Sequence, residues 1–243
     1  MRKFYIIFSL VLLSGCSKDI RKMYSDPNGI KKLNLSRSGL AKIPDQVFKC
    51  ENLEVLILFK NQLKEIPPKI GDLKKLRKLV IGRNDIEKIA PEIGELKNLT
   101  YISAMFNNLK SLPPEFGKLV NLATANFEYN KLDSLPDEIG NLENLAYLQL
   151  NNNQLKKLPE HFYRLSKLRF LHLQRNNLVA LPTKLDSMES LHELNLWKCG
   201  VSQLPGSLCN LRNLEYLFVD QYSKIPYCLT TRTQTARFHL ITQ

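Results

Sequence analysis

Aromatic side chains recur at fixed intervals in the middle of the chain, together with arginine and histidine. Tyr147 and Phe170 are 23 positions apart, and so are Phe106 and Tyr129. Aromatic residues and arginine are enriched in the surfaces through which proteins bind other proteins. The chemistry that this spacing favours is therefore recognition of a partner rather than a covalent reaction.

Catalysis would need a nucleophile and a base, and the sequence offers few candidates. The histidines are His161, His172, His192 and His239. Two of them, His172 and His192, are expected on or beside the surface that carries the regularly spaced aromatic residues. No residue stands out as a nucleophile that a histidine could activate. The sequence also has neither a glycine-rich phosphate loop nor a zinc-binding spacing of cysteine and histidine. We expect a chain that is not an enzyme and has no cofactor and no metal.

A repeat of 23 residues produces the regular spacing. Its opening residue recurs without insertion or deletion at Ile30, Leu53, Leu76, Leu99, Leu122, Leu145, Leu168, Leu191 and Leu214. In the unit that opens at Leu145, Leu148 and Leu150 alternate with polar residues, which predicts a three-residue strand with its leucines inward. One unit cannot bury these leucines alone, so the strands must stack in parallel around one continuous core.

Three other positions of the repeat predict the path of each coil. After the strand, an inward asparagine is expected to pair the backbone of its own turn and of the next one. This structural asparagine ladder comprises Asn61, Asn84, Asn107, Asn130, Asn153 and Asn176. Prolines such as Pro136 are expected outside the strands, on the convex side. The glycines Gly71, Gly94, Gly117 and Gly140 are interpreted as tight returns into the next coil.

The unit reads L-x-x-L-x-L-x-x-N-x-L-x-x-L-P-x-x-I-G-x-L-x-N and resembles the 23-residue form of the leucine-rich repeat family. The resemblance covers roughly residues 30–226. It implies an α/β-type solenoid, a horseshoe of about nine coils, with a parallel β-sheet on the concave face and an irregular or short helical convex face. It also implies that outward strand positions line up on the concave face, where a partner would bind.

Counting by register assigns residues to the concave face. The candidate binding residues are Tyr101, Met105, Phe106, Tyr129, Tyr147, Phe170, His172, Arg175 and Trp197. A basic flank at the N-terminal end of this face comprises Arg37, Lys60 and Arg83. Trp197 and Tyr147 are the first candidates for anchors. The alternative is that the aromatic residues favour strands and stack on their neighbours without any ligand.

The first 16 residues, MRKFYIIFSLVLLSGC, predict export. A basic start precedes an apolar run from Phe4 to Leu13, which is shorter than the roughly 20 residues that span a membrane. Leu13-Ser14-Gly15-Cys16 resembles the lipobox of bacterial lipoproteins, and a plain signal peptide with a chance cysteine is the alternative. The resemblance implies that residues 1–15 are removed and that Cys16 carries lipid (palmitate among its acyl chains), which would hold the protein on a membrane.

The residue after Cys16 bears on location. In enteric bacteria, an aspartate directly after the lipidated cysteine is typical of lipoproteins retained in the inner membrane. This chain has Ser17 at that position. We expect a lipid-anchored protein of the cell envelope, at the outer membrane, with the cell surface as an alternative to the periplasm.

The two ends of the repeat are expected to be capped. Residues 16–29 are expected to form the lipidated N-terminus and a short helix with Ile20, Met23 and Tyr24 on one face. The repeat spacing fails after Val219, so residues 227–243 are expected to form a C-terminal cap, as either a strand or an amphipathic turn. Terminal coils need such covers because their leucines would otherwise face water.

Cysteines other than Cys16 fall into two groups. Cys50 and Cys199 take inward positions of the repeat and are expected to be buried thiols. Cys209 and Cys228 lie near the C-terminal end, where a disulfide is one of the alternatives in an oxidising compartment.

The net charge is +12, and removal of Arg2 and Lys3 with the signal would lower it to +10. A basic surface fits an anionic partner such as lipopolysaccharide or an acidic glycan; the alternative is a solvated convex face rich in lysine. Export disfavours nucleic acid. We expect a monomer that binds a protein on its concave face. Glycan or lipopolysaccharide binding there, or a structural envelope role without a discrete ligand, are the alternatives.

Overall fold

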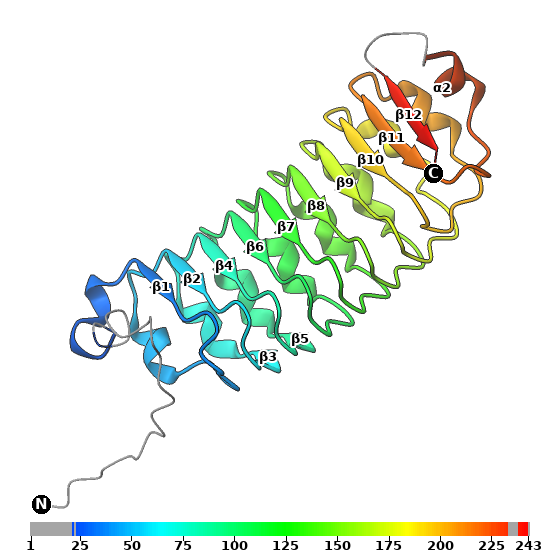
Figure 1. The fold of residues 1–243 in the computed structure, drawn as a ribbon. Helices are drawn as coiled ribbons and strands as arrows, with labels where there is room; N and C mark the ends of the chain where they lie inside the picture. Colours follow the sequence, from blue (N-terminus) through cyan, green and yellow to red (C-terminus); the bar gives the residue numbers. More distant parts are fainter. Residues whose placement is uncertain (1–20, 22, 233–237, 243) are drawn as a thin grey trace, which may run out of the picture.

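The computed structural model describes residues 21, 23–232 and 238–242, and they form one curved solenoid (Figure 1). Its main sheet has ten strands, which follow one another across the sheet in chain order. The strands are β1 (Lys32–Asn34), β2 (Val55–Ile57), β4 (Lys78–Val80), β6 (Tyr101–Ser103), β7 (Thr124–Asn126), β8 (Tyr147–Gln149), β9 (Phe170–His172), β10 (Glu193–Asn195), β11 (Tyr216–Val219) and β12 (His239–Thr242). The predicted stack of parallel strands is confirmed.

Neighbouring strands pair in a register of 23 residues, so equivalent positions form columns. Lys32 lies opposite Val55, and Tyr216 lies opposite His239. The middle residue of each strand points into the coil; Leu148 is 1% exposed. Because side chains alternate along a strand, the first and third residues face the opposite, concave side.

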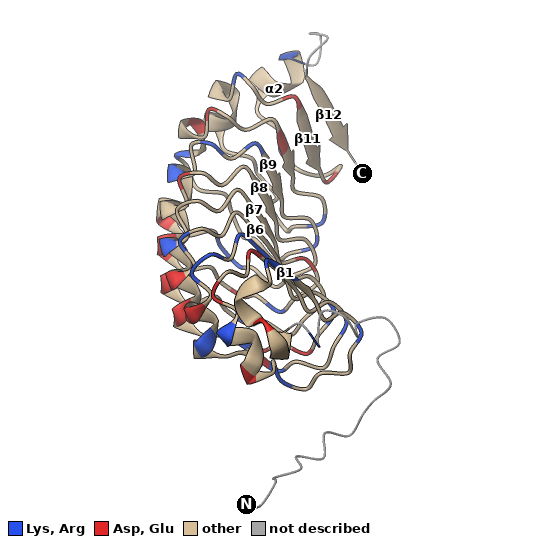
Figure 2. Cartoon of the chain, turned by 90° about the vertical axis from the view of Figure 1, so that its left-hand side faces the viewer, with Lys and Arg blue, Asp and Glu red and all other residues tan. Residues whose placement is uncertain are grey.

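Short 3₁₀ helices cover the convex side of the coils, whereas the strands line the inner side of the curve (Figure 2). These helices are η2 (Asp45–Lys49), η3 (Pro68–Asp72), η4 (Pro91–Glu95), η5 (Pro114–Lys118), η6 (Asp137–Asn141), η7 (Glu160–Arg164), η8 (Leu185–Ser187) and η9 (Gly206–Asn210). Pro136 directly precedes η6 with an extended backbone, φ −67° and ψ 149°, as predicted for a residue outside the strands. A small second sheet joins β3 (Glu65–Ile66) to β5 (Lys88–Ile89).

The core between sheet and helices is one continuous apolar column. Leu145, Leu150 and Leu155 are fully buried within a single coil, and their equivalents are buried in the neighbouring coils. Phe116 and Phe127 fill the middle of the column with their rings edge to face, 5.5 Å apart. No coil buries its leucines without a neighbour, as expected for a solenoid.

The predicted asparagine ladder is confirmed inside the coils. The Asn130 amide nitrogen donates to the carbonyl oxygens of Ala104, at 2.9 Å, and Phe127, at 3.0 Å. Its side-chain oxygen accepts the Leu109 N–H at 3.1 Å. Asn130 thus joins its own coil to the preceding coil, rather than to the next one as the sequence analysis has it. The other five asparagines of the ladder make equivalent bonds.

The interpretation of the repeat glycines as tight returns is wrong. Among the described glycines only Gly39 and Gly200 have a left-handed backbone. Gly117 instead lies in η5, where a Cβ would overlap the carbonyl oxygen of Glu138 and come within 2.6 Å of the Glu138 Cβ. Gly117 is needed here because η5 and η6 approach each other backbone to backbone.

The N-terminal end begins with a short helical turn and η1 (Pro27–Gly29). Met23 is 2% exposed and packs on the first coil, but Tyr24 is 57% exposed and takes no part in this cover. Ile20 and the export and lipidation motifs lie outside the described residues. Within those residues, none of the helices has the length and apolar character that crossing a bilayer requires.

The C-terminal end continues the sheet. After α2 (Tyr227–Arg232), β12 returns to the 23-residue register beside β11, so the prediction that the spacing fails after Val219 is wrong for this strand. Phe238 is buried. A disulfide between Cys209 and Cys228, whose Cα atoms are 5.9 Å apart, ties η9 to α2. The C-terminal cap thus contains a strand, one of the two predicted alternatives, and the Cys209–Cys228 disulfide, which was also one of the alternatives, is present.

Candidate functional site

Four columns of side chains cross the concave face, one residue from each coil in each column. In the coil of β8 they are Tyr147 in the first column, Gln149 in the second, Asn151 in the third and Asn152 in the fourth. The first two columns come from the strand itself, and the other two come from the turn that follows it. The parallel register brings the predicted binding residues together on this one face.

The fourth column has a left-handed backbone in the first eight coils. The φ angles lie between 51° and 58° at Arg37, Lys60, Arg83, Phe106, Tyr129, Asn152, Arg175 and Lys198. Hydrogen bonds to the next coil hold this turn; the Phe106 N–H donates to the carbonyl oxygen of Glu128 at 2.9 Å.

This backbone conformation is costly for most side chains. A left-handed residue other than glycine costs about 1–2 kcal/mol, and asparagine and aspartate tolerate it best. Only Asn152 in the column is of a tolerant type. The column keeps large aromatic and cationic side chains against the local preference, and such strain is typical of functional positions.

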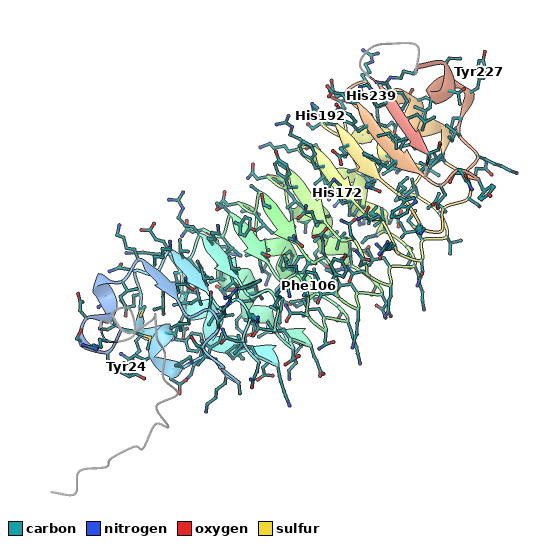
Figure 3. All side chains as sticks on the ribbon, in the orientation of Figure 1. Tyr24, Phe106, His172, His192, Tyr227 and His239 are labelled. Carbon is teal, nitrogen blue, oxygen red and sulfur yellow. A yellow bond between two sulfur atoms is a disulfide. The ribbon has the colours of Figure 1, made fainter. Side chains whose placement is uncertain are left out.

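Two stacked pairs of aromatic rings flank the middle of the face. Tyr147 and Phe170 stack in the first column with ring centroids 4.6 Å apart. Phe106 (labelled in Figure 3) and Tyr129 stack in the fourth column at 4.2 Å. The rings therefore pack on their neighbours, as the alternative reading predicts, yet Tyr147 and Tyr129 remain 41% and 43% exposed. Both pairs offer apolar surface to a partner.

A polar strip runs between the two aromatic pairs. Asn126 donates from its amide nitrogen to the side-chain oxygen of Gln149 at 2.7 Å. Asn151 donates to the Glu128 carboxylate at 2.5 Å. The amide nitrogen of Gln149 has no hydrogen bond to any described residue, so it is free to donate to a partner. The residues of this strip were not among the predicted binding residues, although the register assigns them to the second and third columns.

His172 on β9 (labelled in Figure 3) lies beside Glu193 on the neighbouring strand β10, with Nε2 and Oε1 2.8 Å apart. No hydroxyl or thiol of the described residues hydrogen-bonds to His172. Among the described residues the free thiols, Cys50 and Cys199, are buried, and burial raises the pKa of Cys199 to about 11, so that thiol is protonated and unreactive at neutral pH. The described part of the chain also contains no cluster of three metal-ligating side chains.

Trp197 is half-buried, and two cations of the fourth column lie over its ring. The Arg175 guanidinium carbon is 5.3 Å from the ring centroid, and the Lys198 Nζ is 4.4 Å from it. These cation–π contacts stabilise the cations but occupy the indole. We therefore place Tyr129 and Tyr147 ahead of Trp197 as candidate anchors.

The first three coils, together with Met105 of the fourth coil, carry a different surface, which we call the basic platform. It consists of apolar residues, Ile57, Phe59, Val80 and Met105, with cations around them, Lys32, Arg37, Lys60, Lys78 and Arg83. The cations are exposed, whereas the apolar residues are half-buried. The predicted basic flank is thus part of a wider set, to which the structure adds Lys32 and Lys78.

Comparisons with known proteins agree with this architecture. A family described as leucine-rich repeat region matches residues 115–199 and 160–235, and a leucine rich repeat family matches residues 28–86. Among curated proteins, none matches the chain.

Several solved structures are similar. A leucine-rich repeat protein of Leptospira interrogans is 29% identical with a TM-score of 0.62, over 82% of this chain and 56% of that one. The ectodomain of the Arabidopsis thaliana receptor kinase GASSHO1/SCHENGEN3, solved in complex with CASPARIAN STRIP INTEGRITY FACTOR 2, is 30% identical with a TM-score of 0.76, over 86% and 26%. An internalin of Listeria monocytogenes, at 21% identity and a TM-score of 0.73 over 87% and 60%, shares the fold.

The chain spans less than two thirds of each of these structures. Leucine-rich repeat domains are typically binding scaffolds without enzymatic activity, and the matched families indicate no catalytic one. The repeat, the ten-stranded parallel sheet and the family matches lead to one conclusion: the chain is a leucine-rich repeat protein.

Proposed function

We propose that this protein is lipid-anchored in the bacterial cell envelope and binds another protein through its concave face. The observation that carries the proposal is the fourth column, which holds Phe106, Tyr129 and Arg175 in a strained left-handed backbone. Asparagine would make the same turn at lower cost, as Asn152 does. The large side chains serve a purpose other than folding, and the concave face is where they lie.

The surroundings of these side chains resemble a protein-binding surface. Exposed Tyr129 and Tyr147 lie on either side of a hydrogen-bonded polar strip. Rigid aromatic anchors beside satisfied polar groups are typical of binding hot spots. The similar structure of GASSHO1/SCHENGEN3 is a complex with CASPARIAN STRIP INTEGRITY FACTOR 2, and another similar structure is that of the plant peptide hormone receptor RGFR1 in complex with RGF2. These neighbours support a protein partner here.

Site-specific photo-crosslinking in the producing cells tests the proposal. The photoreactive analogue benzoylphenylalanine replaces Tyr147 on the concave face or, as a control, Tyr227, which is 82% exposed at the start of α2. We expect one defined protein adduct from position 147 and none from position 227. Tyr129→Ala and Tyr147→Ala should each weaken the affinity for that protein about tenfold, because each removes an aromatic anchor.

The control for affinity is Tyr227→Ala, which removes a tyrosine that is still more exposed and lies in α2 rather than on the concave face. Unchanged affinity in Tyr129→Ala and Tyr147→Ala, or equal adducts from both positions, would show that the concave face is not the binding surface.

Support for the anchor is the sequence Leu13-Ser14-Gly15-Cys16 after a short apolar run. Lipid on Cys16 would add about 0.8 kcal/mol of membrane affinity per buried CH₂ group, and two or more acyl chains suffice for stable attachment. Ser17 favours the outer membrane. A protein held there would present its solenoid to partners in the periplasm or outside the cell.

Cell fractionation and protease treatment of intact cells test the anchor and its location. We expect the native chain in the outer-membrane fraction and Cys16→Ser outside all membrane fractions, since serine cannot accept the thioether-linked lipid. Release of peptides from residues 30–226 by protease would place the concave face outside the cell, and protection until lysis would place it in the periplasm. Equal membrane association of Cys16→Ser would refute lipid anchoring.

A further inference from the structure

The first three coils of the concave face contain cations and no acidic residue. Four columns in each of three coils give twelve positions, and five of them are Lys32, Arg37, Lys60, Lys78 and Arg83. None of the five makes an ion pair with any residue that the structure describes. The acidic residues of the face, Glu128, Glu193 and Asp220, all come later along the solenoid. The concave surface is therefore electrostatically polarised along its length.

Two of the cations are held in place by aromatic rings of the next coil. The Lys78 Nζ lies 4.6 Å from the ring centroid of Tyr101, in the first column. The Arg83 guanidinium carbon lies 4.7 Å from the ring centroid of Phe106, in the fourth column, and that ring stacks in turn on Tyr129. Because these long side chains are already ordered, they lose less conformational entropy when they pair with a partner's carboxylates.

Between Lys78 and Arg83 the floor is apolar. Val80 and Gly82 occupy the intervening positions of the same coil. A Cβ at Gly82 would lie 3.1 Å from the Met105 Cγ and 3.5 Å from a ring carbon of Phe59. The missing side chain thus lets Phe59 and Met105 converge over Gly82. The result is a continuous apolar floor with an ordered cation on each side.

We propose that the basic platform binds an acidic segment of the protein partner, with one apolar side chain on the floor and flanking carboxylates paired with Lys78 and Arg83. This inference rests on the proposed function, since it assigns the partner's chemistry on the same face. Carboxylates fit the unpaired cations by charge complementarity, and an aliphatic or aromatic side chain fits the floor between them.

A phosphorylated acyl glycan would share the charge but fits the floor less well. To bind an acyl chain outside a bilayer or micelle, the protein would have to bury most of its length, and the coil beneath the platform is filled. Leu56, Leu58 and Leu79 under the floor are fully buried and leave no opening to the interior. The apolar floor therefore accommodates a side chain rather than an acyl chain.

Selection of a random dodecapeptide library on phage against the purified full-length protein tests the inference. We expect enrichment of peptides in which aspartate or glutamate flanks a large apolar residue. Fluorescence anisotropy of the strongest selected peptide should show about a tenfold loss of affinity for the Lys78→Gln/Arg83→Gln variant. The affinity should also fall as ionic strength rises from about 0.05 M to about 0.5 M.

The matched control is Lys118→Gln/Arg164→Gln, which removes the same charge from exposed positions of η5 and η7 on the convex side. It should leave the affinity unchanged. Selected peptides without acidic enrichment, or equal affinity losses in both double variants, would overturn the inference. Binding of lipopolysaccharide micelles that Lys78→Gln/Arg83→Gln abolishes, without binding of acidic peptides, would overturn it in favour of a phosphorylated amphiphile.

The crosslinking experiment separates this inference from the proposed function. If Tyr147→Ala lowers the affinity for the crosslinked partner and Lys78→Gln/Arg83→Gln does not, the face binds protein, but the partner does not bind through an acidic segment on the platform. If neither variant affects that partner, the proposed function itself fails.

Discussion

Replacing Gly117 by alanine should lower the free energy of unfolding by about 3 kcal/mol, a large effect for one methyl group. The Cβ would overlap the carbonyl oxygen of Glu138 and come within 2.6 Å of the Glu138 Cβ. Both atoms belong to the start of η6, so no flexible side chain can move aside. Relief requires η5 and η6 to separate, which would open the core beneath them. Urea denaturation followed by circular dichroism measures the change.

Gly206→Ala is the matched control for Gly117→Ala. Gly206 opens η9 on the same convex side, but no atom lies within 4 Å of a Cβ placed there. We expect its free energy of unfolding to change by less than about 0.5 kcal/mol. Similar losses in the two variants would mean that backbone conformation, rather than the contact between coils, explains the repeat glycines.

Asn130→Ala should lower the free energy of unfolding by on the order of 1–3 kcal/mol. The substitution leaves the carbonyl oxygens of Ala104 and Phe127 and the N–H of Leu109 without the Asn130 partner in a buried setting. These groups come from two coils, so the coupling between the coils weakens as well. A thermal melt monitored by circular dichroism should show a transition several degrees lower.

Asn177→Ala provides the comparison. Asn177 directly follows Asn176 of the ladder, but its own side chain is exposed. We expect its melting temperature to stay within the error of the native protein. An unchanged melt for Asn130→Ala would contradict the role of the ladder in joining consecutive coils.

Much of the fold follows from the sequence because the repeat fixes one residue spacing for every coil. Leu148 is buried and Asn130 is bonded inside as the periodicity predicts. The same register assigns Tyr147 and Phe170 to one column. The spacing cannot tell how their side chains meet, so the ring stacking of Tyr147 on Phe170 required the structure.

Other features depended on contacts between coils that a single unit does not contain. The role of Gly117 is set by Glu138 in the next coil, and the position of Lys78 is set by the ring of Tyr101. The left-handed turn at Tyr129 escaped prediction because its residue type gives no signal for that backbone. β12 was hidden because residues 227–242 lack the leucine pattern, although the strand keeps the register.

A second asparagine series shows the same limit. Asn98, Asn121 and Asn144 each donate to a carbonyl oxygen of the preceding coil at 2.8 Å. Their position is visible in the repeat unit as the asparagine that ends it, yet exposed asparagine carries no obvious function in a sequence. Lys167 replaces it in one coil and donates to Asn144 at 2.7 Å instead.

Because the register is constant at 23 residues, every coil adds the same length to the concave face. Each coil advances the sheet by one strand spacing, about 4.8 Å, and the basic platform and the aromatic pairs lie on consecutive coils. Duplication or loss of one whole coil between them would change their separation by that single increment and preserve every hydrogen bond of the register. Evolution can therefore refit the face to a longer or shorter partner by unequal recombination within the gene, without redesigning either half.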